Sequence, residues 1–516
     1  MNLPTKKSKQ LKKKSNFLQF FVGKMNLQKL PIIRTMWKKQ NFYKTVQESL
    51  KWYHNDHDPK ELARTNPPKS EKIELHCAWV TEAYTPSNIN SLIKSLKRLG
   101  WEKPEGSIGT KPSLVGWIQQ DRSFGGHSSW MNGGIILSRS DTNRFLGADV
   151  RRAKLPSGVE YGLLSIHNVT SSLTLVTIQF VFNDKVADSL NEPFNSLYKT
   201  RVQYCSSRLR SRGAIYIGVI EQKRQAIKKK IDTIHAGLYL WFSDNLPGHY
   251  SFSKEEALPT VDLITSRKYE QLKENKSRLK DHYTDLLFDY GIEIWTYKED
   301  ANLELRLPWR SIKKPTATLF GNYDKLTQGT DQYGGKDRAA LTSTLHMAFD
   351  VTMRLWATHN LLLSYEQQLS AIRDRAAFHI KGTREALKNL KYIRYHFLSI
   401  SKDTRVISSD VATLFKSKRH YSADGMDFDP PHYFKDVYPT FLELMRQQDK
   451  WRMKQLTKLE SRVNETIISS GNLTLAIANL RIQRNVLWFT IFVAILTLLS
   501  VFRNDLLNLL QQILTF

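Results

Sequence analysis

The chain carries one uncharged apolar segment near its C-terminal end, Val486 to Phe502, with the sequence VLWFTIFVAILTLLSVF. Its 17 residues are enough for a helix to cross the hydrocarbon core of a bilayer. Arg484 and Arg503 flank the segment, and Trp488 lies near one end, where an indole favours the membrane interface. A helix that is apolar on every face must be buried all round. We therefore expect one transmembrane helix at 486–502, followed by a short amphipathic tail at 503–516.

The residues before this span predict an unusually long helix. No proline follows Pro439 as far as Phe502, and Gly471 is the only glycine. Apolar residues recur there at three- and four-residue steps, as in a coiled coil: Leu456, Leu459, Val463, Ile467 and Ile477. A helix of about 64 residues would be roughly 95 Å long. We expect a stalk helix at 439–485 that enters the bilayer directly, its apolar stripe covered by neighbouring helices or by other copies of the chain.

Within the span, residues at steps of four, three and four make one face of modest side chains with two hydroxyls: Thr490, Ala494, Thr497 and Val501. Such a face permits close packing of helices in a membrane. It can equally line a narrow pore in a homo-oligomer, or simply face lipid with each hydroxyl bonded to its own backbone.

The remainder predicts an α+β cytoplasmic domain at 71–317, a flexible glycine-containing linker at 318–338 and an all-helical region at 339–438. The expected strands are 73–80, 113–118, 134–137, 161–167, 172–182, 261–265 and 291–297, with a hairpin across 168–171. The expected helices are 85–99, 214–242, 267–288, 339–377, 383–398 and 409–415.

Basic residues exceed acidic ones by 77 to 49, a net charge of +28, which favours an anionic partner. A cationic stretch at 199–230 is the best candidate for an anionic ligand, possible ligands being a nucleotide or nucleic acid, and a solvated or membrane-facing surface is the alternative. Its candidate residues are Arg201, Arg208, Arg210, Arg212, Lys223, Arg224 and Lys228.

Residues 1–70 read as a basic arm and linker, since the first 40 residues hold eleven Lys or Arg and no acid. The arm is interpreted as a solvated tail or as a contact with anionic lipid or nucleic acid. Phe17 to Val22 is too short for the apolar part of a signal peptide. We therefore expect a single-pass protein of the lipid bilayer with its N-terminal domain in the cytoplasm.

No enzyme signature is specific, so no catalytic residue, metal site or cofactor is predicted, although enzymatic activity stays open. The spacings Arg354 to His359 and Arg373 to His379 fit the loose pattern of some helical ribonucleases. The cluster His54-Asn-Asp-His-Asp58 can bind a metal by residue type, but it is more typical of a solvated turn.

The stretch Leu473 to Phe502, with the helical region from 339, resembles the CorA family of divalent-cation transporters in pattern. That resemblance implies a cytoplasmic α/β domain, a long helix entering the membrane and a pentameric assembly. The family's Gly-Met-Asn signature and second span do not follow Phe502, so ion selectivity is not carried over. We expect a channel-like or membrane-disrupting oligomer gated by an anionic signal, like the CorA-like effectors of antiviral defence. The alternatives are a membrane-tethered nucleic-acid binder or nuclease, and a tail-anchored scaffold.

Overall fold

The computed structural model describes most of the chain beyond the N-terminal arm: residues 66–103, 113–124, 128–142, 149–198, 201–206, 212–253, 257–269, 283–287, 292–308, 315–330, 335–377, 383–416, 426–435 and 437–515. The basic arm up to residue 65, with its histidine cluster, lies outside these ranges. Two compact units divide the chain. The first comprises 1–66 and 196–223, and the second comprises 67–195 and 224–516.

The second unit is built on a mixed sheet that has ten strands in the described ranges, in the order β12-β9-β10-β11-β8-β1-β5-β4-β2-β3. Only β8 with β11 and β2 with β3 run parallel there. The strands are β1 (Ile73–Tyr84), β2 (Ser129–Leu137), β3 (Val150–Arg152), β4 (Val159–Thr170), β5 (Leu173–Phe182), β8 (Thr260–Ser266), β9 (Ile292–Tyr297), β10 (Leu303–Pro308), β11 (Thr316–Asn322) and β12 (Phe428–Asp429).

The described residues also form four long helices and several short ones. The long helices are α8 (Val219–Asn245), α11 (Arg338–Ala377), α12 (Thr383–Lys416) and α14 (Phe441–Val501). The shorter ones are α4 (Ile89–Leu99), α5 (Leu114–Phe124), α6 (Asp184–Ala187), α7 (Asn191–Asn195), α9 (His249–Phe252), α10 (Tyr323–Leu326) and α15 (Arg503–Leu514). Single 3₁₀ turns are η3 (Asp188–Leu190), η4 (Tyr283–Leu287), η5 (Thr327–Gly329) and η7 (His432–Phe434).

Successive side chains of a strand face opposite sides of the sheet. Alternate residues of the central strands therefore contact helices on two different sides. Phe180 packs against Trp241 of α8, with ring centroids 5.5 Å apart. On the opposite face, the Gln179 amide donates to the Thr342 carbonyl of α11 at 3.0 Å, and Trp79 contacts Phe349. The sheet therefore lies between α8 on one side and α11 on the other, and both faces belong to one hydrophobic core.

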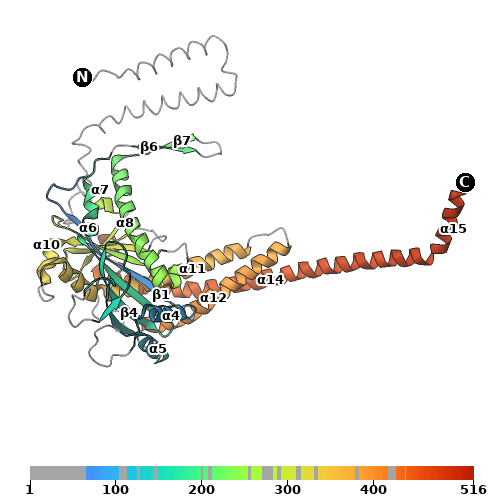
Figure 1. Ribbon diagram of the computed structural model, residues 1–516, viewed down its shortest axis with the longest axis horizontal. Helices are drawn as coiled ribbons and strands as arrows, with labels where there is room; N and C mark the ends of the chain where they lie inside the picture. Colours follow the sequence, from blue (N-terminus) through green and yellow to red (C-terminus); the bar gives the residue numbers. More distant parts are fainter. Residues whose placement is uncertain are drawn as a thin grey trace, which may run out of the picture. The chain divides into compact units, whose positions relative to one another are not determined.

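Three helices lie side by side beyond the sheet: α11, α12 and the beginning of α14 (Figure 1). Thr440 caps α14, since its hydroxyl accepts from the Glu443 N–H at 3.2 Å. The helix begins at Phe441, two residues past the start expected at Pro439. The helix then runs for 61 residues without a break. The expected long helix is therefore present.

The first unit contains a two-stranded hairpin of β6 (Arg201–Ser206) and β7 (Arg212–Ile217) in the described ranges. The helix expected at 214–242 is therefore wrong at its beginning, where the chain is still β7. The β-branched residues Ile215 and Ile217 favour a strand there, and α8 starts only after Gly218.

The strand expected at 113–118 is wrong, since these residues begin helix α5. The Ser113 hydroxyl accepts from the Gly116 N–H at 2.9 Å and so starts the helix. Leu114, Val115 and Ile118 are buried on one helical face. The apolar run was too short for its period to separate a strand from a helix.

The flexible linker expected from residue 318 is also corrected. Residues 318–322 complete strand β11, which pairs with β8 and β10 and is mostly buried. A Cβ on Gly321 would lie 2.7 Å from the Asn302 carbonyl oxygen, so this glycine reflects close packing. Helix α12 likewise joins the two shorter helices expected at 383–398 and 409–415. Residues 270–282 of the helix expected at 267–288 lie outside the described ranges.

Candidate functional site: a core helix that continues as an exposed apolar helix

Helix α14 changes its surroundings part-way along. We define its inner half as residues 441–467 and its outer half as residues 468–501. In the inner half Leu456 and Val463 are fully buried, and Ile467 packs against the same core. From Ile468 onward every large apolar side chain described is exposed, Leu480 to 65%. The stripe expected along the helix is thus covered by neighbouring helices as far as Ile467, whereas Ile477 is exposed.

Polar contacts fix the inner half to α11 and α12. The Asp449 carboxylate is completely buried and lies 2.6 Å from Nδ1 of His359 on α11. Arg452 pairs with Glu366, also on α11. Glu460 is buried and accepts from Ser401 of α12, and the Arg405 guanidinium lies 2.9 Å away. Phe441 packs against Trp295 of β9, so the helix is anchored to the sheet as well.

The outer half is long and apolar enough to cross a membrane. Thr490, Ala494, Thr497 and Val501 lie on one side of it, as their spacing requires. The Thr490 hydroxyl donates to the Val486 carbonyl at 2.9 Å, and Thr497 donates to Val493 at the same distance. Each hydroxyl proton is therefore used within the helix, while the oxygen lone pairs remain available to accept a hydrogen bond.

The cationic candidates are spread over both units. Arg201 and Arg212 occupy opposite ends of the β6–β7 register, opposite Ile217 and Ser206 respectively. Arg208 and Arg210 lie outside the described residues. In the first unit, buried Lys223 donates to the Asn66 side chain. Burial lowers the pKa of Lys223 to about 8. The burial of Lys223 and its hydrogen bond to Asn66 favour a structural role for this residue over an exposed phosphate contact.

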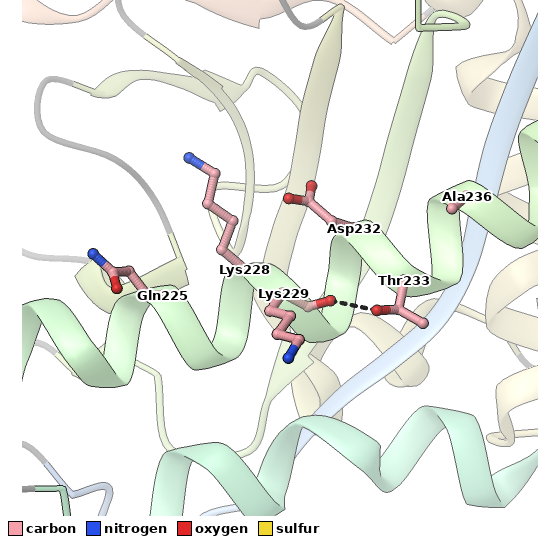
Figure 2. Close-up of a pocket in the computed structure, with 6 residues that line it drawn as sticks. All are labelled: Gln225, Lys228, Lys229, Asp232, Thr233 and Ala236. Carbon is pink, nitrogen blue, oxygen red and sulfur yellow. Dashed lines mark hydrogen bonds between the residues drawn. The ribbon is translucent and has the colours of Figure 1, made fainter. Parts of the chain in front are cut away.

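In the second unit, one side of α8 borders a shallow hollow of about 400 Å³ (Figure 2). Arg224 is buried and directly precedes Gln225, the first residue that borders the hollow. Among the predicted candidate residues, only Lys228 borders it. Asp232 stands on the same side of the helix as Lys228 (Figure 2), which reduces the positive charge of the hollow. The bordering residues are Gln225, Lys228, Lys229, Asp232, Thr233 and Ala236.

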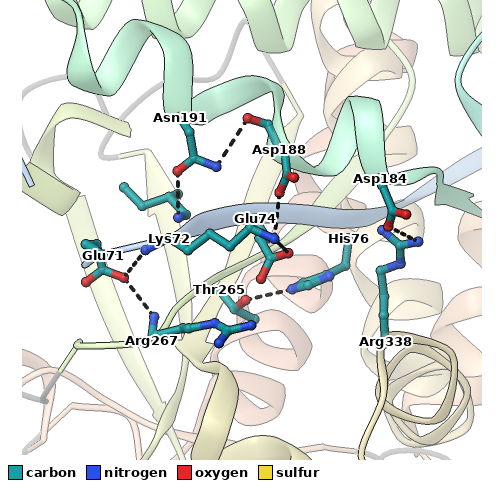
Figure 3. A network of polar contacts seen from close by, with 11 residues as sticks. Glu71, Lys72, Glu74, His76, Asp184, Asp188, Asn191, Thr265, Arg267 and Arg338 are labelled. Carbon is teal, nitrogen blue, oxygen red and sulfur yellow. Dashed lines mark hydrogen bonds and ion pairs between the residues drawn. The ribbon is translucent and has the colours of Figure 1, made fainter. Parts of the chain in front are cut away.

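A second group of polar side chains, not anticipated from the sequence, surrounds the beginning of β1 (Figure 3). Lys72 lies 2.7 Å from Glu74 and 3.0 Å from Asp188 of η3. Glu71 accepts from the Arg267 backbone N–H at 2.8 Å after β8. His76 Nε2 lies 2.6 Å from the Thr265 hydroxyl. This network joins β1, η3 and the end of β8. The charged residues at 71–74 were the only sign of it in the sequence.

Burial, with Arg338 and Lys72 nearby, lowers the pKa of His76 to about 3. The imidazole is therefore neutral at physiological pH and holds no charge for a ligand. Another interior group lies between β4 and α11, where Nε2 of His167 is 2.8 Å from Asp350. Burial lowers the pKa of the neighbouring His346 to about 4. The polar contacts around His76 and those around His167 both connect the sheet to the elements that pack against it.

The ribonuclease-like pairs do not form a shared site in the described structure. Arg354 donates to the Ser128 hydroxyl at 2.9 Å, whereas His359 is buried against Asp449. Arg373 pairs with Asp374 on the surface, and His379 lies outside the described residues. Among the described residues, no group of three or more His, Cys, Asp or Glu side chains is placed to hold a metal ion.

A scan against protein-family models and searches of curated proteins and of solved structures find no match to this chain. The CorA-like pattern accordingly rests on the sequence alone. In α14, one helix belongs both to the folded core and to a segment able to cross a membrane.

Proposed function

We propose that the chain is a membrane effector in which the sheet domain controls the bilayer through α14. One observation supports this most directly: α14 has buried contacts with α11, α12 and β9 in its inner half and continues unbroken into the candidate span. A continuous helix transmits a displacement of its base along its axis. A change in the sheet domain therefore reaches the membrane without an intervening hinge.

In this proposal the folded part lies in the cytoplasm, and an anionic signal acts on the cationic residues of 199–230. The outer half forms or disrupts a membrane path together with other copies. The net charge of +28 supports an anionic signal, and the buried pairs of Asp449 and Glu460 support a firm mechanical connection. We propose no catalytic step.

The coupling is tested at Gly471, the only glycine of α14 and a position where a Cβ meets nothing within 4 Å. Gly471→Pro removes a helical hydrogen bond and kinks the helix, at a cost of about 3 kcal/mol. Gly471→Ala is the matched control, because it favours the helix by up to about 1 kcal/mol. Both variants keep the folded core and the span.

The measurement is dye release from phosphatidylcholine–phosphatidylglycerol liposomes that carry the reconstituted protein. We expect the proline variant to change release at least fivefold relative to the wild type and the alanine variant to match the wild type. Equal release from all three proteins, with all three co-floating with liposomes, would refute coupling and favour a tail-anchored scaffold.

A membrane-tethered nucleic-acid binder is the second candidate, favoured by the basic residues around the β6–β7 hairpin. It predicts binding of a single-stranded 20-mer RNA that weakens steeply with salt. Replacing Arg208, Arg210 and Arg212 by Ala should then reduce the salt slope. Unchanged binding in this triple variant would exclude the hairpin as the contact.

A further inference from the structure

The outer half of α14 carries two apolar seams on opposite sides of the helix before it reaches the candidate span. Seam A consists of Leu473, Ile477 and Leu480, and seam B consists of Ile468, Leu475 and Ile482. Leu473 and Leu475 are two residues apart, which places them about 200° apart around the helix at about 100° per residue. All six side chains are exposed, Leu475 to 59%.

In the inner half the face of seam B is polar, whereas the face of seam A carries polar residues beside Leu444 and Leu459. Gln455, Arg462 and Thr466 continue the line of seam A at steps of seven and four residues, and Lys450, Thr457 and Asn464 continue the line of seam B. On the face of seam B, polar side chains are therefore replaced by Ile and Leu from Ile468 onward. No charged residue occurs between Glu465 and Arg481. This change of character is specific to the part of the helix that its neighbours leave uncovered.

Lipid is a poor occupant for these seams. The outer half is about 50 Å long, while the hydrocarbon core of a bilayer is about 30 Å thick. If 486–502 crosses the core, the seams lie in the aqueous or headgroup region. There, exposed Leu and Ile at heptad spacing are typical of a helix that packs against another helix. Because the span fixes every copy in the same orientation, a parallel copy of this chain is the natural partner.

We propose that copies of the chain assemble side by side, seam A of one against seam B of the next. This inference rests on the proposed membrane function and names the partner of its effector helix. Two different faces in contact make a heterologous interface, and such interfaces close into a ring when the rotation permits.

Two further lines of residues distinguish the inside of the ring from its outside. One line of polar residues between the seams runs down the outer half at steps of seven and four: Asn472, Asn479, Gln483, Thr490 and Thr497. On the opposite side, Trp488 and Phe492 follow the line of the buried residues Leu456 and Val463, which face α11 and α12. The polar line therefore faces the enclosed path, whereas the aromatic side chains face lipid.

The test uses the full chain in detergent, with its mass measured by native mass spectrometry. Leu475→Glu breaks seam B, Leu480→Glu breaks seam A, and Asn472→Glu adds the same charge on the polar line. Because these side chains are exposed, the free energy of unfolding should not change. We expect the wild type and Asn472→Glu to be oligomers, and each seam variant alone to be a single chain.

A mixture of the two seam variants decides the type of interface. Each retains the seam that the other lacks, so the mixture should form pairs of one copy of each and nothing larger. A monomeric wild type, seam variants of wild-type mass, or dissociation by Asn472→Glu would overturn the proposal. So would seam variants that dimerise alone, since that indicates like-to-like contacts. Co-floatation of every protein with liposomes is measured first: a floating monomer refutes only the ring, whereas a protein that does not float refutes the membrane function.

Discussion

The two halves of α14 have one backbone conformation and opposite relations to their surroundings. The inner half buries a stripe that includes acidic groups, Asp449 and Glu460, and its exposed side chains are polar except for Trp451. The outer half has exposed apolar residues on most of its faces. Helix propensity alone thus does not decide where a helix lies, because packing partners and solvent select each face. The inner half is stabilised by its own chain, whereas in the proposed assembly the outer half is covered by a membrane and by other copies.

The largest expected effect comes from the inner half at Asp449. Asp449→Ala leaves the buried His359 without its partner, and breaking such a pair costs about 3–5 kcal/mol. Chemical denaturation of the detergent-solubilised protein measures the loss. Lys450→Ala, at the next and exposed position, is the control and should change the stability by less than about 0.5 kcal/mol. Equal effects of the two changes would contradict the assignment of the inner half to the core.

A matched pair of leucines compares the two halves directly. Leu456→Ala removes a fully buried side chain and should cost about 2–5 kcal/mol. Leu473→Ala makes the same change at a side chain that is 59% exposed, and it should leave the unfolding free energy of the folded part unaltered. If the second variant is as unstable as the first, then the outer half is covered within the single chain.

A pH effect should be confined to the folded part. Burial raises the pKa of Glu82 from 4.5 to about 7, although the side chain accepts from Ser251 and from the Tyr250 and Ala83 backbone N–H groups. Between pH 4.5 and 7 the folded state therefore binds more protons than the unfolded state. Its stability should fall as the pH rises through this window, by at most about 3 kcal/mol.

Glu82→Gln should flatten that dependence, measured as the denaturation midpoint against pH. The outer half up to Asn485 holds only Arg481 and Arg484 as charged residues, so helix content in liposomes should not follow the same curve. A wild-type slope that persists in Glu82→Gln would assign the titration to another group.

Local sequence patterns predicted the helices and strands in which apolar residues recur at regular spacing. The hairpin of β4 and β5 and the long helix α11 follow expected strands and an expected helix closely. The errors fall where the local signal was ambiguous. Ser113–Ile118 is apolar enough for a strand, and Gly321 looks like part of a loop, until burial against distant segments is considered.

The candidate sites also differ in how well the local sequence predicted them. The face of Thr490 and Thr497 follows from helical spacing alone, and the structure adds only that both hydroxyls donate within the helix. The cationic residues, in contrast, were grouped because they are close in sequence. The structure separates buried Lys223 and Arg224 from Lys228, which borders the hollow one turn further along α8.

The sequence by itself determined the apolar segment at 486–502, the uninterrupted helix before it and the large positive charge, because each depends on composition or periodicity within a short window. Only the tertiary structure decided that Ile467 is the last covered residue of the stripe and that Asp449 meets His359, 90 residues away. Contacts of that range depend on how the sheet and three helices fill a common core, and no local pattern encodes which surfaces meet.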